Sequence, residues 1–373
     1  MTTLQGTLAL LLLACVAPAA SNAPLPIGII GLVHGHAAGF LSGGALVPAG
    51  GASKRADIKL VGVVEPDDQV FAKYAERYKW PASIRYRSIE ELASSAHPKA
   101  VLVFTSTAGH TDVVKRCATL GIHVMMEKPL AVSYGDALAI AEAAQRGRVH
   151  VLVDYETTWY PSNTAAHDLL NQHQLGAVTK VVFRDGHNGP VKIHVQPEFL
   201  RWLTNPKENG AGALYDFGCY GADLTTWLMN GETPASVTAV TKQLQPDVYP
   251  DVDDGADVLV EYKNAVAILQ GSWNWPFGVK DMDLYGQTGY MKTNAKTIEV
   301  GRSEDKPAET YIPKPLQAPY DDPLHYLAAV LRGDIDEGND PSSLKTNVTV
   351  AEILDAARQS ARSGHKVDLP LKR

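Results

Sequence analysis

Short apolar runs alternate with amphipathic segments through the first part of the chain. The runs read LPIGIIG, IKLVGVV, KAVLVF, IHVMME and HVLVDY, and most of their positions are apolar. Such runs are typical of parallel strands that are covered on both faces. Ser88 and Ser133 open helical segments with capping-box-like spacing, and Gly121 stands where another helix should end. The order of strands and helices over residues 24–153 therefore predicts a doubly wound, Rossmann-type domain with a parallel sheet.

The pattern changes after the last of these runs. Two helices are expected, over about 162–174 and near 220–229, with the strand VTKVVFRDG and a long loop between them. The runs SVTAVTKQL, ADVLVEY, AVAILQGSW, DMDLYG and YMKTN follow, and most of them alternate between apolar and polar positions. Residues 154–373 therefore predict a second domain, built on a large, mainly antiparallel sheet with helices on one face.

Turn residues and two more helical patterns complete this second domain. Asn264, and the pair Gln287–Thr288 before Gly289, mark hairpin connections. Amphipathic helices are expected over about 322–332 and 348–362, at the end of the chain. The sequence contains no internal repeat and no low-complexity segment.

Composition and charge narrow the class of protein. The chain has 373 residues, of which 45% are hydrophobic and 20% charged, which suits two globular domains that each bury a core. Its net charge is −7 without any block of like charge, which argues against nucleic acid or another polyanion as a partner. Cys117 and Cys219 lie far apart in sequence and imply no disulfide framework.

The first 23 residues are interpreted as a secretory signal peptide. The stretch LALLLLACVAPAASNA is apolar over about a dozen residues and then turns to small residues, as in the h-region and cleavage zone of a signal. It is too short for a transmembrane span. Cleavage is expected near Ala20 or Ala23, with lipidation at Cys15 as the alternative, although no Lys or Arg precedes Lys54. We therefore expect a secreted or periplasmic protein.

The stretch GIIGLVHGHAAG follows the first strand and has the composition of a phosphate-binding turn. Gly31 is in place, Val33 breaks the G-x-G-x-x-G pattern, and Gly35 restores close backbone approach if the turn is one residue longer. A cofactor turn and a plain strand–helix turn both remain open. His34 and His36 are expected to donate hydrogen bonds to phosphate or substrate, or to hold the loop. No metal site is predicted, because zinc needs three or four ligands and no carboxylate or cysteine lies nearby in sequence.

Polar residues stand at the carboxyl tips of the later strands, which is the edge where such sheets bind ligands. Glu65 ends the second strand, where a carboxylate accepts hydrogen bonds from both ribose hydroxyls and repels a 2′-phosphate; a solvated turn carboxylate is the alternative. This position favours NAD over NADP. The candidate cofactor contacts at the next two tips are Thr105, Ser106, His110, Glu127 and Lys128.

Several motifs together resemble the Gfo/Idh/MocA family of oxidoreductases. They are AGH and EKP in the first domain, YPSN at the junction, GAGALYDFGCYGAD in the second domain and AARQSARSGHKVDL near the end. The resemblance covers nearly the whole chain after the leader, and it implies an NAD(P)-binding Rossmann domain followed by a domain for substrate binding and oligomerisation. It implies that Lys128 of EKP contacts the substrate hydroxyl and the nicotinamide ribose. It also implies that Tyr220 transfers the proton, in place of the histidine of many members, and that Asp216 orients the lysine or binds a substrate hydroxyl.

Elementary chemistry agrees with these implied roles. An ammonium beside a hydroxyl favours the alkoxide character that develops as hydride leaves carbon. A phenol has a pKa near ~10, so Tyr220 needs a nearby cation to act at neutral pH, and Lys128 would supply it. The competing interpretations are a surface lysine on a tight turn and a buried aromatic residue at a helix start.

Aromatic residues and a histidine in the second domain are candidate substrate contacts. Tyr155 and Tyr160 lie at the domain junction, and the long loop carries His187 and Trp202. Trp273, in the stretch SWNWP, either stacks on a sugar face or packs in the core.

The expected function is an exported oxidoreductase that transfers hydride between a sugar or polyol carbon and a tightly bound NAD. Tight binding is expected because free NAD is scarce outside the cytosol. An NAD-dependent glycosidase that oxidises its sugar transiently would use the same Lys128 and Tyr220. A sugar-binding relic that has lost the nucleotide is favoured by Val33 and opposed by the set of Lys128, Asp216 and Tyr220. A homo-oligomer formed through the exposed face of the second sheet is expected by analogy with the family.

Overall fold

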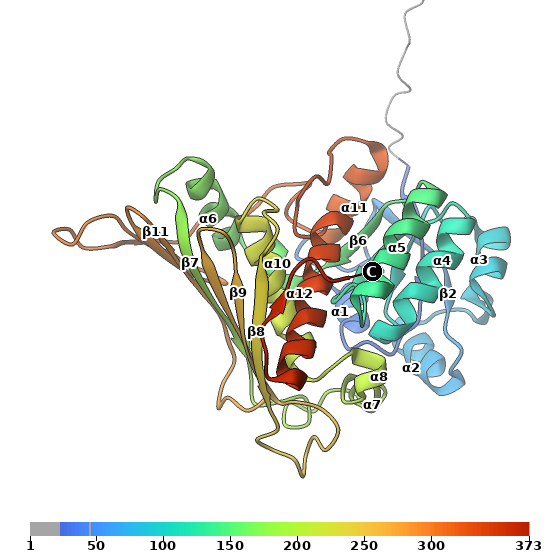
Figure 1. Ribbon diagram of the computed structural model, residues 1–373. Helices are drawn as coiled ribbons and strands as arrows, with labels where there is room; N and C mark the ends of the chain where they lie inside the picture. The colour runs from blue at the N-terminus through green and yellow to red at the C-terminus, as the bar shows by residue number, and fades with distance from the viewer. Residues whose placement is uncertain (1–22, 45, 373) are drawn as a thin grey trace, which may run out of the picture.

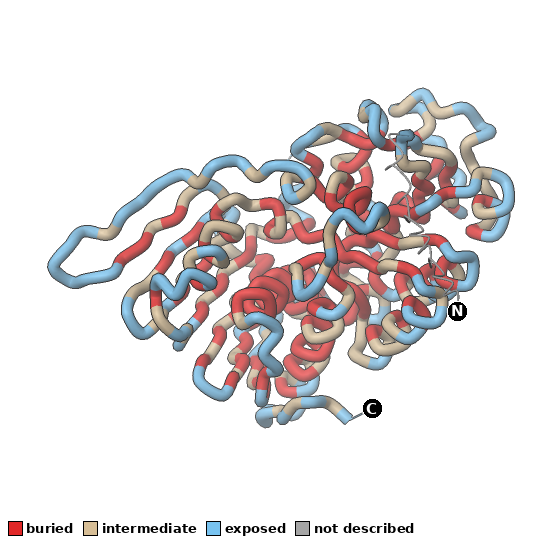
Figure 2. The backbone as a smooth tube through the Cα atoms, turned by 90° about the horizontal axis from the view of Figure 1, so that it is seen from above, coloured by how far each residue is buried: buried red, intermediate tan, exposed pale blue. Residues whose placement is uncertain are grey.

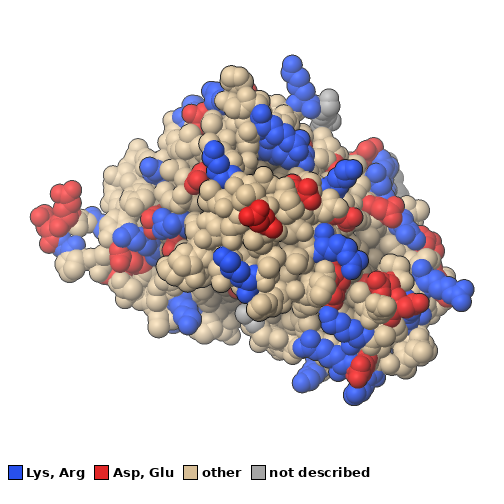
Figure 3. All heavy atoms as spheres, turned by 90° about the horizontal axis from the view of Figure 1, so that it is seen from below, with Lys and Arg blue, Asp and Glu red and all other residues tan. Residues whose placement is uncertain are grey.

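The computed structural model describes residues 23–44 and 46–372. They form two sheets that lie side by side, with helices between and around them (Figure 1). Buried residues gather where the helices meet the sheets, and exposed residues follow the connecting loops (Figure 2). On the face that Figure 3 shows, basic and acidic side chains are interspersed. The signal peptide expected over residues 1–23 lies outside the described residues except for its last position, and so does Cys15.

The first sheet has six parallel strands in the order β3-β2-β1-β4-β5-β6. They are β1 (Leu25–Ile30), β2 (Ile58–Val64), β3 (Arg85–Tyr86), β4 (Ala100–Val103), β5 (His123–Glu127) and β6 (Val151–Asp154). Every residue of β4 and β6 is buried, as expected for apolar strands that are covered on both faces. The predicted Rossmann-type sheet is therefore confirmed. Its strand order reverses between β1 and β4, where sheets of this kind bind ligands.

Two helices of this part begin directly after Ser88 and Ser133, as the sequence predicts. The helices are α1 (Ala37–Ser42), α2 (Asp68–Tyr78), α3 (Ile89–Ala96), α4 (His110–Thr119) and α5 (Tyr134–Gly147), with the 3₁₀ turns η1 (Ala82–Ile84) and η2 (Thr107–Gly109). The Ser88 hydroxyl accepts a hydrogen bond from the Glu91 N–H, and the Ser133 hydroxyl accepts one from the Asp136 N–H. Gly121 follows α4 with a φ of 68°, a conformation that favours glycine.

The second sheet has nine strands in the order β14-β13-β12-β11-β7-β10-β9-β8-β15. They are β7 (Val178–Gly186), β8 (Ser236–Lys242), β9 (Gly255–Glu261), β10 (Val266–Ser272), β11 (Val279–Gly286), β12 (Tyr290–Asn294), β13 (Ile298–Gly301), β14 (Glu309–Tyr311) and β15 (Val367–Asp368). β7 and β10 pair in parallel, and the other neighbouring strands pair antiparallel. The prediction of a large, mainly antiparallel sheet is confirmed.

The helices of the second part follow the prediction except in the long loop. They are η3 (Glu156–Trp159), α6 (Pro161–Asn171), α7 (Pro197–Leu203), α8 (Pro206–Asn209), α9 (Ala213–Asp216), α10 (Gly218–Leu228), α11 (Pro323–Arg332) and α12 (Leu344–Ser363). The segment predicted as a long loop contains α7, α8 and α9, which are too short to produce a helical periodicity. Among the described residues, no helix is both long and apolar enough to cross a membrane.

Two of these helices bring the halves of the molecule together. α10 and α12 lie between the sheets in Figure 1, and every residue of α10 is buried. α12 packs on β8 and α10 on one side and on α5 on the other. α11 returns to the first sheet, where Leu324 and Leu327 share a core with Ile27 and Ile29 of β1. The carboxyl edge of the first sheet therefore faces the start of α10.

Candidate active site

Lys128 joins the two parts of the molecule at the carboxyl edge of the first sheet. It directly follows β5, and only 5% of its surface is exposed. Its ammonium Nζ donates to the Asp216 carboxylate oxygen Oδ1 at 2.5 Å and to the Asp216 carbonyl oxygen at 2.9 Å. Asp216 is the last residue of α9, and it lies 88 positions after Lys128 in the sequence. This burial rules out the alternative of a surface lysine on a turn.

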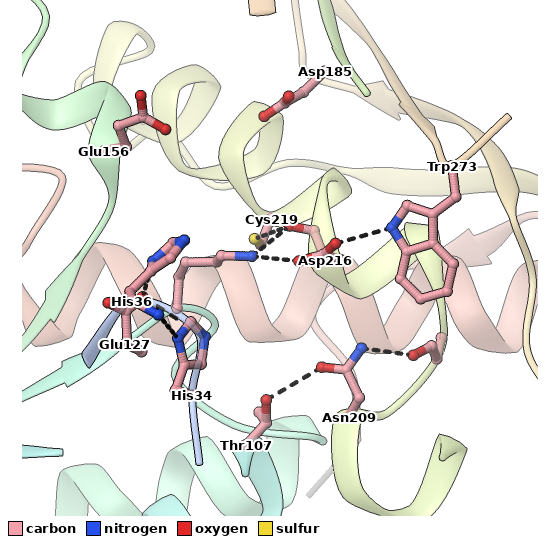
Figure 4. Close-up of polar contacts among 12 residues, drawn as sticks. His34, His36, Thr107, Glu127, Glu156, Asp185, Asn209, Asp216, Cys219 and Trp273 are labelled. Carbon is pink, nitrogen blue, oxygen red and sulfur yellow. Dashed lines mark hydrogen bonds and ion pairs between the residues drawn. The ribbon is translucent and has the colours of Figure 1, made fainter. Parts of the chain in front are cut away.

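Asp216 is held by charge and by a second hydrogen bond. The indole N–H of Trp273 donates to its other carboxylate oxygen, Oδ2, at 2.9 Å (Figure 4). Burial alone would raise the pKa of Asp216, but the Lys128 ammonium and these hydrogen bonds outweigh it and lower that pKa. Burial likewise opposes the charge on Lys128, yet the Asp216 carboxylate raises its pKa. Both groups are therefore charged at neutral pH. Trp273 is fully buried, which agrees with core packing, and its bond to Asp216 is a role that sequence reasoning missed.

Tyr220 lies one helical turn after Asp216, on α10. Its ring centroid is 5.0 Å from Lys128 Nζ, and the Tyr155 ring packs edge-on against it at 5.5 Å. Its hydroxyl makes no hydrogen bond to another described residue, so it is available to a ligand. Burial raises the pKa of Tyr220 well above its ordinary value, and the carboxylates of Glu156 and Asp185 raise it further. Tyr220 is therefore protonated at neutral pH.

A second group of charges lies near Tyr220 and belongs to none of the sequence motifs. Lys280 Nζ is 3.0 Å from Glu156 Oε2, 3.6 Å from Asp185 Oδ2 and 4.2 Å from the centroid of the Tyr220 ring. Asp185 is 1% exposed, and its Oδ2 atom has no hydrogen-bond partner among the described residues. Burial raises the pKa of Asp185 to about 7. Sequence reasoning missed all three charged residues of this group.

The signal that identifies this group is charge at inward-facing strand positions. Asp185 shares a face of β7 with Phe183, and Lys280 shares a face of β11 with Met282. Phe183 and Met282 are buried, so the two charged residues point to the same side as the core. A polar residue at an apolar position of an alternating strand is the kind of departure that marks a functional site.

The glycine loop turns as its first glycine predicts. Gly31 has a φ of 77°, and a Cβ atom there would lie 2.7 Å from Thr105 Cγ2, so the turn requires glycine. Gly35 is expected to let a cofactor phosphate approach the backbone, but its neighbour in the structure is helix α7. A Cβ atom there would come within 3.0 Å of the Phe199 ring of α7, so the absence of a side chain lets α7 approach the loop.

Glu127 lies beside both histidines of the loop (Figure 4). Its Oε2 atom is 3.0 Å from His36 Nδ1 and 3.9 Å from His34 Nε2. The structure thus supplies the carboxylate that the sequence did not place near these histidines, and the three side chains have the donor types of a metal site. The backbone N–H of His36, however, donates to His34 Nδ1, which leaves the proton of neutral His34 on Nε2, the nitrogen that faces Glu127. Burial, and then the nearby His36 and Lys128, keep the pKa of His34 low. His34 therefore presents an N–H to Glu127, and we interpret the three side chains as a polar cluster in which His36 bonds to Glu127.

Helix α7 covers the glycine loop from the second domain. The rings of Phe199 and Trp202 lie 4.7 and 5.5 Å from the ring of His34. The indole N–H of Trp202 donates to the carbonyl oxygen of Val33 at 3.3 Å. Trp202, a predicted substrate contact, thus contacts the loop, and its contact with substrate stays a prediction.

Two further contacts tie this segment to the first domain. Lys73 Nζ of α2 is 2.6 Å from Glu198 Oε1 of α7. The Thr107 hydroxyl donates to the side-chain oxygen of Asn209, which ends α8, at 3.2 Å (Figure 4). The segment from α7 to α8 therefore bridges the glycine loop and the tip of β4.

Glu65 is buried under the glycine loop. Its Oε2 atom accepts the Leu32 N–H at 2.7 Å, and its Oε1 atom accepts the Asp67 N–H at 2.8 Å. Burial raises its pKa, and the two N–H groups lower it in part. The alternative of a solvated turn carboxylate is ruled out, because the residue is only 2% exposed. Its contact with ribose stays a prediction.

The other predicted cofactor residues line the tips of β4 and β5. Thr105 and Ser106 are half-buried, and the Thr105 hydroxyl donates to the Ser106 carbonyl. His110 Nδ1 faces the Leu130 carbonyl oxygen at 3.2 Å, and burial lowers the pKa of His110 to about 4. Its Nε2 atom and Glu127 Oε1 are buried without a hydrogen-bond partner among the described residues. Buried polar atoms normally have partners, so these two atoms suit a site that binds a polar group.

The remaining predicted substrate residues surround Tyr220 in different ways. The Tyr155 hydroxyl donates to Asn347 of α12, and the Tyr160 hydroxyl donates to Glu156. His187 is half-buried with its ring edge-on to Phe217, and its Nδ1 accepts the Gly189 N–H. Its free nitrogen Nε2 therefore carries the proton and is a donor. Tyr155 and Tyr160 use their hydroxyls in these bonds, whereas His187 keeps Nε2 free to donate to a ligand.

The fold and this site define a two-domain α/β protein with a nucleotide-binding type of sheet and a charged, buried centre where the domains meet. A family model described as "Oxidoreductase family, NAD-binding Rossmann fold" matches residues 27–155, and a model described as "GFO/IDH/MocA C-terminal domain" matches residues 163–292. The chain belongs to the Gfo/Idh/MocA family.

Curated relatives agree with this assignment, and a solved structure has a similar fold. Trans-1,2-dihydrobenzene-1,2-diol dehydrogenase of Xenopus tropicalis is 26% identical over 311 residues, which is 81% of this chain and 90% of that protein. Inositol 2-dehydrogenase of Rhizobium meliloti is 24% identical and covers 67% of this chain and 73% of its own. In fold, the chain is similar to aldose-aldose oxidoreductase from Caulobacter crescentus, with a TM-score of 0.76 at 22% identity over 93% of this chain and 100% of that one.

Proposed function

We propose that the protein transfers hydride between a hydroxyl-bearing carbon of a sugar or polyol and a nicotinamide cofactor. The observation that carries the proposal is the buried pair of Lys128 and Asp216 beside a tyrosine whose hydroxyl is unbonded. When bound, the nicotinamide accepts or returns the hydride. The curated relatives named above act, by their names, on a diol and on inositol, which supports a polyhydroxylated substrate.

The chain's own residues supply proton transfer and charge. Lys128 places an ammonium where the reacting hydroxyl gains alkoxide character, which stabilises that charge. Asp216 fixes the direction of the ammonium through its carboxylate and its carbonyl oxygen. Tyr220 is protonated at neutral pH and donates its proton to the oxygen of a carbonyl that is reduced. When an alcohol is oxidised, Tyr220 first releases its proton to solvent, and the phenolate then accepts the proton of the substrate hydroxyl.

The residues present suit a dinucleotide. Glu127 and His110 each have a buried atom without a partner, and they stand at the strand tips where such cofactors bind. The segment from α7 to α8 covers this edge, which supports tight retention of the cofactor. We propose NAD over NADP because a carboxylate, Glu65, directly follows β2. Glu65→Ala should then weaken NAD binding more than NADP binding in calorimetric titrations. An equal loss for both would assign Glu65 to the loop, through the Leu32 N–H, and remove it from cofactor selection.

The central test combines mass spectrometry with turnover. Protein purified without added nucleotide, then denatured, should release NAD at close to one equivalent. Native protein should interconvert a polyol and a carbonyl sugar in a panel that contains myo-inositol, glucose and fructose. Release of reducing sugar from glycosides without net NADH would instead assign the glycosidase function. No retained NAD and no binding of added NAD would assign the relic that has lost its nucleotide, which Val33 favours.

Export and assembly are separate proposals. We propose that residues 1–23 direct secretion, with lipidation at Cys15 as the alternative to cleavage, and that copies of the chain associate through the exposed face of the second sheet. N-terminal sequencing of the protein from the cell envelope should find a start near Ala20 or Ala23, or a blocked Cys15. A start at Met1 in the cytosolic fraction would contradict export, and light scattering of a monomeric mass would contradict assembly.

A further inference from the structure

A second ammonium lies against the Tyr220 ring, and it comes from a strand without any motif of the site. Lys280 Nζ is 4.2 Å from the ring centroid, nearer than Lys128 Nζ at 5.0 Å. We propose that Lys280 is a positioning residue for Tyr220: together with Lys128 it supplies the positive charge that stabilises the phenolate when the hydroxyl gives up its proton. The proposal rests on the proton-transfer role proposed for Tyr220.

The strand register fixes Lys280 at this place. β11 and β7 are antiparallel, and Lys280 pairs directly with Asp185. The next pair on the same face is Met282 with Phe183, and both of these residues are buried. Because side chains alternate along a strand, the register that buries this apolar pair also turns Lys280 and Asp185 inward. The ammonium therefore reaches Tyr220 as a consequence of sheet geometry.

Two carboxylates hold the ammonium beside the ring. Lys280 Nζ is 3.0 Å from Glu156 and 3.6 Å from Asp185, and the other oxygen of Glu156 accepts the Tyr160 hydroxyl at 2.6 Å. Figure 4 shows the carboxylates of Glu156 and Asp185 turned toward each other. Burial opposes the charge on Lys280, but Asp185 and Glu156 raise its pKa above the ordinary value. Lys280 therefore remains an ammonium at neutral pH.

The groups around Tyr220 oppose formation of the phenolate, and the Lys280 ammonium counters them. Burial raises the pKa of Tyr220, and Glu156 and Asp185 oppose a phenolate in the same way. Lys128 is paired with the Asp216 carboxylate and Lys280 with Glu156, so each ammonium is only partly available to the phenol and both contribute. A cation over an aromatic face is attracted by the ring, and the attraction grows when the ring carries negative charge. Lys280 offsets the carboxylates at the point where the phenolate forms.

The competing interpretation is a cross-strand ion pair that stabilises the sheet and does nothing to Tyr220. The two interpretations differ in the ionisation of Tyr220, which can be measured without substrate. A fluorinated tyrosine, whose phenol ionises at lower pH than that of tyrosine, is placed at position 220 of the full chain. Its ¹⁹F resonance is then followed through a pH titration.

The decisive variant is Lys280→Met. Loss of the ammonium should raise the midpoint of the ¹⁹F titration by about one pH unit or more, whereas Lys280→Arg, which keeps the charge, should leave it nearly unchanged. Lys292→Met is the matched control, because Lys292 Nζ lies 5.3 Å from the Tyr290 ring on the neighbouring strand and away from the site. An unmoved midpoint in Lys280→Met overturns the proposal.

Lys280→Met is also made in an Asp185→Asn background, because Lys280→Met alone leaves the buried Asp185 carboxylate unpaired and can impair folding. The double variant differs from Asp185→Asn only in the ammonium, so its midpoint should be higher than that of Asp185→Asn. Equal midpoints in these two variants overturn the proposal. Because no turnover is required, a protein without the proposed activity still gives a clear result. An active protein with an unmoved midpoint separates failure of this proposal from failure of the proposed function.

Discussion

The two sides of the site are held in place by different forces. On the catalytic side, opposite charges face one another: the buried Lys128 and Asp216, and the half-buried Lys280 with Glu156 and the buried Asp185. On the cofactor side, the glycine loop is held by aromatic rings from α7 and by the bond from Trp202 to Val33. Removing Lys128 leaves the buried Asp216 carboxylate uncompensated, whereas a packed loop tolerates substitutions that keep its shape. The irregular glycine pattern lies in the packed loop, which is the part that tolerates substitution.

The loop keeps its turn although Val33 stands where the motif has its second glycine. Gly31 retains the left-handed conformation that the turn needs. At Val33 the contact is through the backbone carbonyl, which any residue provides. Glu65 holds the same loop from below through the Leu32 N–H. Trp202 and Glu65, which lie outside the glycine motif, thus hold the loop in its conformation.

Lys128→Met should have the largest effect, because it leaves Asp216 buried without a countercharge. We expect turnover to fall by about 10³-fold or more and the free energy of unfolding to fall by about 3–5 kcal/mol. Steady-state hydride transfer and urea denaturation measure the two effects. The double variant with Asp216→Asn should recover stability but not activity. If Lys128→Met keeps its activity, the charge pair is not required on the catalytic side, and the contrast between a charged catalytic side and a packed cofactor side is wrong.

Asp185 should make stability fall as pH rises. Burial raises its pKa to about 7 in the folded protein, against about 3.9 in an unfolded chain. Between these values the folded state keeps a proton that the unfolded state has released, so stability decreases from about pH 4 to about pH 7 and is constant above. Relative to wild type, Asp185→Asn should gain stability across this window, by up to about 4 kcal/mol at pH 7. Urea denaturation at several pH values measures the difference, and a difference that does not vary with pH contradicts the prediction.

Tyr220→Phe should lower turnover by about 10²-fold without changing folding. The hydroxyl has no hydrogen bond to another described residue, so its removal leaves no buried partner unsatisfied. NAD binding and the unfolding midpoint should match wild type, which separates this variant from Lys128→Met. Unchanged turnover would remove Tyr220 from proton transfer and make it a buried aromatic residue.

The fold was predictable from the sequence wherever its causes are local. The apolar runs of the first sheet, the caps at Ser88 and Ser133 and the alternating strands of the second sheet each carry their own signal. The short helices α7 to α9 do not, because they are stabilised by packing between distant segments. The parallel pairing of β7 with β10 depends on the path of the long connection between them, and no local sequence pattern predicts that path.

The candidate site divides in the same way. Lys128, Asp216 and Tyr220 stand in recognisable motifs and lie together as expected. Lys280 stands in none, and its place depends on the register between β7 and β11. The contact of Glu127 with His36 joins residues 91 positions apart, so the sequence shows two histidines without their carboxylate.

Trp202→Phe should have the smallest effect and the most specific one. It removes the indole N–H that donates to the Val33 carbonyl, and it keeps an aromatic ring against His34. A lost hydrogen bond of this kind is worth about 1 kcal/mol, so NAD should dissociate roughly five times faster, while turnover at saturating NAD stays at the wild-type value. Stopped-flow fluorescence of NAD release measures the change, and Trp227→Phe is the control, because its ring stacks on His167 in the second domain. If Trp202→Phe instead lowers turnover at saturating NAD, the loop and the buried charges act as one unit, and the division between a packed side and a charged side no longer holds.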